Sequence, residues 1–256
     1  MITQGTCRAY SEYLLAHALH RVDTLCTHPA VLPVGFSLCP GGTRVTESRR
    51  RVTVYIDGFN LYYGLLKPTP AVRWLDLKAL GKAMRPDCDV QVRYFTAKVM
   101  PVPDGGSRDR QRLYLKALET LRPTVTIHYG RFTVHPVRMA YVAPIVPMVK
   151  TALVWKTEEK GSDVNIATFL LLDGHDGLYD EAIVISGDSD LVEPIRQANR
   201  RFGPVHVMNP RNLHSDLALA ATTYGPLDPA LLPRCQFPDT VRLPTGRSVT
   251  RPSNYR

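Results

Sequence analysis

Four aspartates, far apart along the chain, have the side chains best suited to chemistry. They are Asp57, Asp163, Asp188 and Asp190. Two like unit charges 4 Å apart repel by about 1 kcal/mol in water and by about 4 kcal/mol at an effective dielectric constant of 20. If the fold gathers these carboxylates, it therefore needs a cation or a shared proton. All-oxygen ligands suit a hard ion, so we expect Mg²⁺ or Mn²⁺ rather than zinc.

The chemistry expected of such a site is attack on a phosphodiester. A metal ion polarises the phosphate, activates water and stabilises the leaving oxygen, and a pair of ions acts on both ends of an in-line displacement. The competing interpretation is structural, because Asp and Ser are favoured at helix N-caps. Capping does not explain an aspartate after each of two apolar runs, residues 52–56 and 182–186, or the doubled acid Asp188-Ser-Asp190. We therefore favour the metal site.

Alternating strands and helices are expected to position these side chains. The sequence pattern predicts strands at 52–56, 90–97, 125–129, 152–155, 182–186 and 205–208, and helices at 75–84, 107–121, 163–172, 191–202 and 215–221. Residues 130–147 read as an excursion with a short hairpin, and residues 156–162 as a charged loop. Such alternation predicts an α/β fold, a mainly parallel sheet with helices on both faces. Sites in these sheets collect beyond the carboxyl ends of the strands, where the aspartates stand.

The sequence pattern at both ends of the chain differs from that of its centre. Residues 1–50 read as a poorly ordered extension with one amphipathic helix at 10–25, and residues 226–256 as a loosely wrapped Pro/Arg-rich tail. We expect the functional domain at 51–225.

Composition restricts the class of protein. A net charge of +9 over 256 residues favours a polyanionic partner. The five cysteines are widely spaced and odd in number, and Cys26, His28 and Cys39 lack the paired spacing of a zinc site. A reducing cytoplasm is therefore expected. Nothing resembles a signal peptide, and no run of eighteen apolar residues predicts a membrane span.

Three blocks of sequence resemble the signature of the bacterial NYN-domain family, within the PIN-like ribonuclease superfamily. They are YIDGFNLY at 55–62, KTEEKGSDVN at 156–165 and SGDSDL at 186–191. The stretches 110–118, 128–132 and 232–238 are also similar, so the resemblance covers about residues 51–240. It implies a three-layer PIN-like fold with a central sheet of about five strands, and an endoribonuclease that depends on Mg²⁺ or Mn²⁺.

The resemblance also implies roles for particular residues. By position, the four aspartates are the catalytic and metal-binding set, while Asn60 and Ser186 are their polar supports. Many family members have Asn where this chain has Gly187, a departure that removes no ligand.

Basic and aromatic residues beside the blocks are candidates for RNA contacts. We expect Lys160 and Arg131 to contact phosphates, and Tyr62 to stack on unpaired bases of single-stranded RNA. One of Tyr62 and Tyr63 is expected in the core. Two further acids, Glu158 and Glu159, are expected to pair with the neighbouring lysines rather than to bind metal.

Three other functions compete with RNA cleavage. A phosphatase that forms an aspartyl-phosphate presents Asp-x-Asp at its first strand, and Asp57 is followed by Gly58 and Phe59. A metal-dependent DNA nuclease stays open, because the metal chemistry does not need the 2′-hydroxyl. A non-catalytic RNA-binding or regulatory module of the same fold also stays open, as does assembly into a homo-oligomer.

Overall fold

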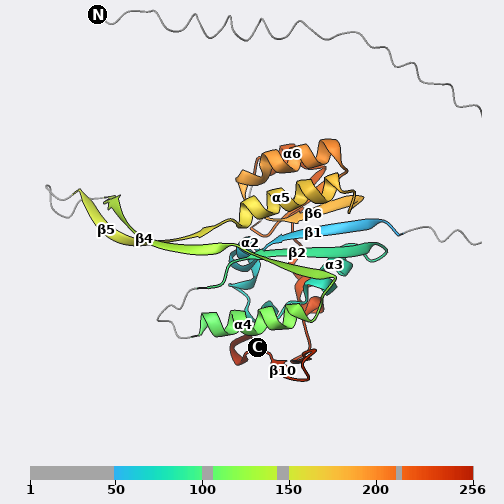
Figure 1. The fold of residues 1–256 in the computed structure, drawn as a ribbon, viewed down its shortest axis with the longest axis horizontal. Coiled ribbons are helices and arrows are strands. Elements are labelled where there is room, and N and C mark those ends of the chain that lie inside the picture. Colours follow the sequence, from blue (N-terminus) through green and yellow to red (C-terminus); the bar gives the residue numbers. More distant parts are fainter. Residues whose placement is uncertain (1–48, 100–105, 143–149, 212–214, 256) are drawn as a thin grey trace, which may run out of the picture. The chain divides into compact units, whose positions relative to one another are not determined.

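The computed structural model describes residues 49–99, 106–142, 150–211 and 215–255 (Figure 1). These residues fall within one compact unit, Glu47–Arg256. The helix expected at 10–25, and almost all of the expected N-terminal extension, lie outside the described residues. Within the described part of the chain, no helix is both long and apolar enough to cross a membrane.

Six parallel strands form the central sheet, in the order β3-β2-β1-β6-β7-β8. They are β1 Arg51–Asp57, β2 Asp89–Thr96, β3 Val125–Tyr129, β6 Glu181–Ile185, β7 Val205–Asn209 and β8 Thr223–Pro226. Strands β1 and β6 are buried almost throughout, as continuous apolar runs in parallel sheets require. The α/β fold predicted from sequence is confirmed, with six strands where about five were expected.

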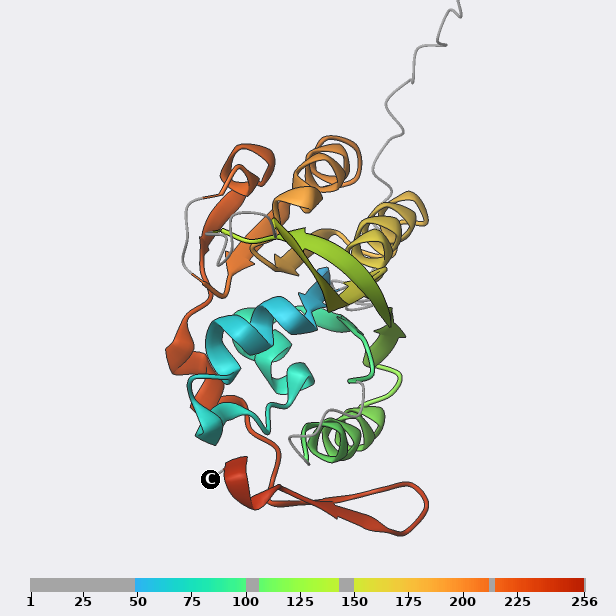
Figure 2. The ribbon, with the colours of Figure 1, turned by 90° about the vertical axis from the view of Figure 1, so that its left-hand side faces the viewer.

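Helices cover both faces of this sheet (Figure 2). The longer ones are α3 Leu77–Met84, α4 Ser107–Glu119, α5 Ser162–His175 and α6 Val192–Arg201; the shorter turns are α2 Gly58–Leu61, η1 Tyr62–Leu66, η2 Pro70–Val72, η3 Ser189–Leu191 and α7 Leu217–Ala220. In Figure 1, α5 and α6 lie on one side of the sheet, and α3 and α4 on the other. Alternate residues of β1 face the two cores, since Tyr55 packs with α5 and α6 while Val54 and Ile56 pack with α3 and α4.

Strand order creates a crevice at one point of the sheet. Counted among themselves, the parallel strands run 3-2-1-4-5-6, so the direction of winding reverses between β1 and β6. Ile56 of β1 is in register with Ile185 of β6, which places Asp57 and Ser186 side by side at the carboxyl edge. Open α/β sheets bind their ligands at this reversal.

A long antiparallel hairpin interrupts the alternation. It pairs β4 Arg131–Ala140 with β5 Thr151–Lys160 and extends away from the sheet (Figure 1). Near its base, the ring of Phe132 packs edge-on against Phe59, with centroids 5.6 Å apart. The predicted short hairpin and charged loop at 156–162 were therefore wrong. Their polarity belongs to a ribbon that is exposed on both faces, rather than to a loop.

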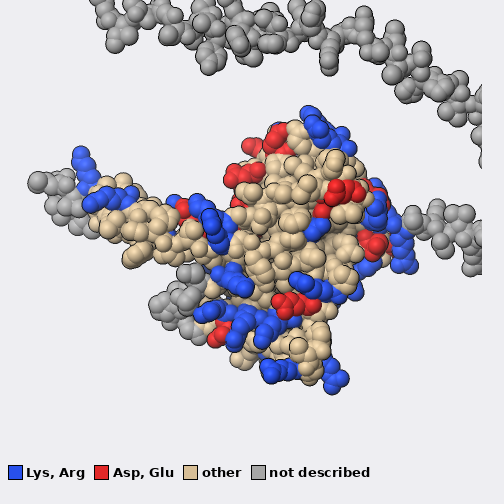
Figure 3. All heavy atoms as spheres, in the orientation of Figure 1, with Lys and Arg blue, Asp and Glu red and all other residues tan. Residues whose placement is uncertain are grey.

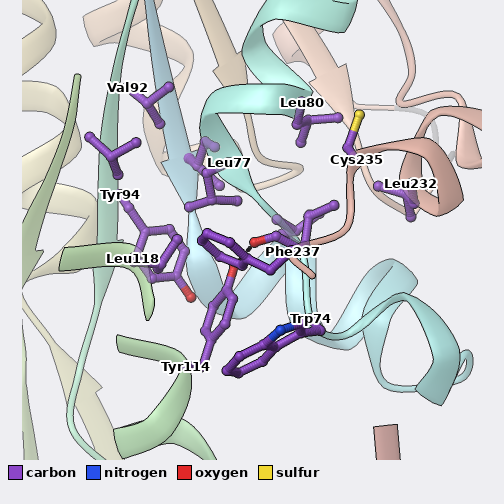
Figure 4. Close-up of a cluster of buried hydrophobic side chains, with 14 of the residues drawn as sticks. Trp74, Leu77, Leu80, Val92, Tyr94, Tyr114, Leu118, Leu232, Cys235 and Phe237 are labelled. Carbon is purple, nitrogen blue, oxygen red and sulfur yellow. Dashed lines mark hydrogen bonds between the residues drawn. The ribbon is translucent and has the colours of Figure 1, made fainter. Parts of the chain in front are cut away.

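The C-terminal segment closes one of the two cores. It contains η4 Pro229–Cys235, β9 Thr240–Arg242, β10 Ser248–Thr250 and η5 Ser253–Tyr255. Figure 4 shows Leu232, Cys235 and Phe237 in the same buried cluster as Trp74, whose indole N–H donates to the carbonyl of Pro238 at 2.9 Å. The expected loose wrapping is thus replaced by burial, because prolines stop regular helices here without keeping apolar side chains from packing.

Candidate active site

Asp57 ends β1 with a carboxylate that is only 3% exposed. One oxygen, Oδ1, accepts from the backbone N–H groups of Phe59 at 3.0 Å and Asn60 at 2.9 Å, so Asp57 is the N-cap of α2. The sequence makes this turn because an aspartate that follows a strand satisfies the open N–H groups of the next helix.

Two polar side chains engage the other oxygen of Asp57. Asn60 Nδ2 donates to Oδ2 at 2.6 Å, and Ser186 Oγ donates to the same atom at 3.0 Å. Asn60 and Ser186 also bind the turn after β6, since Asn60 Oδ1 accepts from Gly187 N at 3.3 Å and Ser186 Oγ accepts from Asp188 N at 3.1 Å. Both predicted supports therefore lie on Asp57 and join the ends of β1 and β6.

Burial and hydrogen bonds act in opposite directions on Asp57. Burial raises the pKa of its carboxyl group, and the hydrogen bonds from Asn60, Ser186 and Phe59 lower it in part. The four donors therefore favour the ionised form at a place where solvent does not stabilise it.

Asp188 and Asp190 stand in the turn that follows β6. Asp188 is half-buried, and its Oδ1 accepts from Asp190 N at 3.0 Å, which makes it the N-cap of η3. Asp190 is exposed. Asp57 and Asp188 therefore both cap a helix and belong to the group of aspartates, because the turns that end the strands also begin the helices.

Asp163 is the second residue of α5 and completes the group. Burial, followed by the negative charges of Asp57, Asp188, Glu159 and Asp190, raises the pKa of its carboxyl group to about 6. The fold therefore brings the four aspartates into one electrostatic neighbourhood. We call Asp57, Asp163, Asp188 and Asp190 the acidic site.

The acidic site offers oxygen ligands but not a complete coordination sphere for a metal ion. Among the described residues, no three His, Cys, Asp or Glu side chains stand in an arrangement that holds a metal ion directly. Mg²⁺ dehydrates reluctantly and usually keeps several waters beside one or two carboxylates. The donor set fits such a hydrated ion by its chemistry, since it is all carboxylate and carries uncompensated negative charge.

Glu159 acts at this site in a different way from the one the sequence led us to expect. We expected Glu158 and Glu159 both to pair with lysines, and only Glu158 does, with Lys156 and with Lys160 Nζ at 3.1 Å. Glu159 instead accepts from Ser162 Oγ at 2.9 Å, and its charge acts on Asp163. The residues read as a loop alternate in direction along β5, which a loop does not predict.

Sequence reasoning missed Asn209. It is 2% exposed at the end of β7, where Oδ1 accepts from Arg211 N at 2.8 Å and Nδ2 donates to the hydroxyl of Tyr224 at 2.8 Å. With Asn60, Gly187 and Arg211 it lines a polar depression of about 350 Å³. The available signal was its place directly after an apolar run, the same rule that selected Asp57.

The residues predicted to bind RNA lie in two places. Arg131 and Lys160 are partners in register at the base of the hairpin. Tyr62 is half-buried and packs against the core, with the guanidinium carbon of Arg73 5.9 Å from its ring centroid, while Tyr63 is 51% exposed.

A family model matches most of the described chain. Residues 51–228 match the model of the family described as NYN domain. The 6-hydroxy-3-succinoylpyridine 3-monooxygenase HspA of Pseudomonas putida is 28% identical over 237 residues, which cover 80% of this chain and 75% of that protein. A protein of unknown function from Vibrio parahaemolyticus has a solved structure with a TM-score of 0.46 and 18% identity, covering 72% of this chain and 96% of that one.

Proposed function

The chain belongs to the NYN domain family, and from that premise we propose that it is a metal-dependent endoribonuclease. The observation that supports the proposal is that the aspartates after β1 and β6 lie close enough to Asp163 of α5 for their charges to raise its pKa, at the point where the sheet reverses. Mutual repulsion makes such a group unfavourable unless a cation offsets it. Its position at the carboxyl edge is where a substrate reaches it.

Each residue has a role in this proposal. Mg²⁺ or Mn²⁺, held by the acidic site, would polarise the phosphodiester and activate the attacking water. Asn60 and Ser186 hold the Asp57 carboxylate in one orientation through hydrogen bonds of 2.6 and 3.0 Å. Lys160 and Arg131, at the base of the hairpin, would contact phosphates of the RNA on either side of the bond that is cut.

The test is cleavage of labelled single-stranded RNA by the purified full chain in Mn²⁺. We expect EDTA to stop the reaction and Asp188→Asn to abolish it while circular dichroism shows a folded protein. Asp176→Asn is the matched control, because Asp176 is exposed at the far end of α5 and should leave the rate unchanged.

Two outcomes would replace this function. RNA binding without cleavage, in both Mg²⁺ and Mn²⁺, would favour a non-catalytic RNA-binding module. Faster cleavage of DNA than of RNA of the same sequence would favour a DNA nuclease.

A second candidate comes from the Pseudomonas putida relative, whose name states monooxygenation of a substituted pyridine. The observation that favours it here is a cavity with aromatic walls next to Asp57. Supplying 6-hydroxy-3-succinoylpyridine, oxygen and a nicotinamide reductant tests it. Substrate-dependent oxygen uptake that survives Asp188→Asn would support this candidate over the nuclease.

A further inference from the structure

A cavity of about 320 Å³ lies beside the acidic site, on the side of the sheet that carries α4. It is enclosed by α2 and η1, the end of β2, α4 and Tyr255 near the C-terminus. Gly58 and Phe59 line it, and both belong to the turn that Asp57 caps. The cavity and the acidic site therefore share one wall.

Aromatic rings form much of the cavity wall. Phe59, Tyr62, Tyr94, Tyr114 and Tyr255 all contribute to it. The rings of Tyr94 and Tyr114 meet edge to face with centroids 6.4 Å apart, so they present differently directed surfaces. Unpaired bases stack on aromatic side chains with little regard to their identity, because every base has a flat π-face.

Positive charge accompanies the rings. Lys67, Arg73 and Arg110 line the cavity, and none of its lining residues within the described chain is acidic. Nor does any of these three cations form an ion pair with a described carboxylate. Half-buried guanidinium groups without a carboxylate partner favour an anion such as phosphate, which they bind with two parallel hydrogen bonds.

Arg73 and Arg110 are held in place around the opening. Arg73 Nε donates to the carbonyl of Leu66 at 2.9 Å, and its guanidinium carbon lies 5.7 Å from the ring centroid of Tyr255. Arg110 lies in the first turns of α4. Its hydrogen bond to the hydroxyl of Tyr255 offsets part of the rise in the pKa of Tyr255 that burial causes. Fixed cations lose little conformational entropy when a ligand binds, so they add to affinity.

We propose that this cavity binds one unpaired nucleotide of the RNA substrate, with the base against the tyrosines and a phosphate at Arg110 and Arg73. The inference rests on the proposed endoribonuclease function and adds a subsite to it. A volume of about 320 Å³ is at the lower end of ligand pockets, which suits one nucleotide and not a base pair. The shared wall at Gly58 and Phe59 places the next phosphodiester toward Asp57.

The shared chemistry is a planar ring that carries an anion, which a small aromatic acid also has. Titration calorimetry on the full chain in EDTA separates the two sources, with AMP and UMP in one arm and nicotinate in the other. Adenosine and uridine, which lack phosphate, measure the contribution of the cations. We expect the nucleotides to bind at least about tenfold more tightly than the nucleosides and nicotinate.

Variants then assign the site. Arg110→Gln should weaken AMP binding about tenfold, and Tyr62→Leu should weaken AMP and adenosine alike, because it removes a ring without removing charge. Arg112→Gln is the matched control, since Arg112 is exposed two residues away on α4 and pairs with Asp109 at 3.2 Å. It should bind AMP as the wild type does.

Failure of this inference is distinguishable from failure of the nuclease. No AMP or UMP binding at millimolar concentration, or nicotinate binding in preference to both, overturns the nucleotide subsite whether or not RNA is cleaved. Equal weakening by Arg110→Gln and Arg112→Gln overturns it too. Nucleotide binding in EDTA by a chain that cleaves nothing would retain the subsite and reject the nuclease.

Discussion

Burial and neighbouring negative charges both disfavour the ionised form of Asp163. The pKa of its carboxyl group rises from 3.8 to about 6 because of burial and then of four neighbouring carboxylates. A folded-state pKa above the unfolded value means that the group's contribution to stability is complete at low pH. That contribution is lost as the pH rises through about 6.

Metal-free protein should therefore be stabilised by Asp163→Asn in a pH-dependent way. In EDTA we expect the variant to melt at a higher temperature than the wild type at about pH 7.5, and at nearly the same temperature at about pH 4. Differential scanning fluorimetry over this range measures it. Mn²⁺ should reverse the order at about pH 7.5, because only the wild type keeps the carboxylate. A difference that is constant with pH would contradict the assigned cause.

At Gly187, the turn after β6 lies close to Asn209 at the end of β7. A Cβ atom built there would lie 2.6 Å from Asn209 Oδ1 and 2.9 Å from its Nδ2. Asn209 is buried and hydrogen-bonded, so it has little room to move.

We expect Gly187→Ala to cost about 1–3 kcal/mol in the free energy of unfolding, as overpacking does. The same change on an Asn209→Ser background should cost clearly less, which a double-mutant cycle in urea measures. Gly225→Ala serves as the control, because a Cβ there meets nothing within 4 Å. Equal costs at 187 on both backgrounds would show that Asn209 is not the obstacle.

Strand ends explain which site residues the sequence could predict. Asp57 and Asp188 follow buried apolar runs, and the reversal of the sheet brings such positions together. Asn209 obeys the same rule and was missed because an amide carries no charge that would call for a ligand. For Glu159 the sequence predicted a lysine partner, whereas its actual partner, Ser162, depends on how β5 meets α5, which is a tertiary property.

At the scale of elements, a buried ion pair fixes α5 against the sheet. Asp173 of α5 is 3% exposed and pairs with Arg93 of β2, and its Oδ2 also accepts from the hydroxyl of Tyr55 at 2.7 Å. Because α5 begins at Ser162, this anchor in its last turns also governs where Asp163 stands at its other end.

Graded substitutions should reveal this anchor. Asp173→Asn leaves the Arg93 charge without its partner and should destabilise the fold by about 3 kcal/mol, whereas Tyr55→Phe removes one hydrogen bond and should cost about 1 kcal/mol. Chemical denaturation measures both. If Tyr55→Phe costs as much as Asp173→Asn, the ion pair does not dominate the anchor.

Helices and strands could be predicted where the pattern of apolar residues along the chain is enough to define them. The strand at 125–129 and the helix start at Ser107 agree with the prediction, because apolar periodicity sets them. The hairpin is longer than predicted, since most residues of its two strands are exposed and carry no burial pattern that marks a strand. The predicted C-terminal tail is instead a packed segment, in which the ring of Phe237 lies 5.8 Å from that of Trp74, centroid to centroid.

Across the whole molecule, charge is distributed unevenly. The net charge is +9, and on the face shown in Figure 3 Lys and Arg gather in the region of α4. That helix carries Arg108, Arg110, Arg112 and Lys116 against two acids. The basic surface thus adjoins the cavity, which Arg110 of α4 lines.

RNA affinity should accordingly fall steeply with salt. Single strands lose about 0.7 in log K per phosphate contact for each tenfold rise in salt. About five contacts, from the three cavity cations with Lys160 and Arg131, would lower the affinity about a hundredfold between about 50 and 200 mM salt. Fluorescence anisotropy with a short RNA in EDTA measures this. A flat response would remove the role given to the basic surface.

Gly161 is the whole of the junction between the hairpin and α5. Its φ of +100° lies in the left-handed region that favours glycine, and Asp163 follows two residues later. The hairpin and α5 are thus connected through a single residue. A side chain at this position would strain the left-handed backbone that sets the direction in which α5, and with it Asp163, leaves the ribbon.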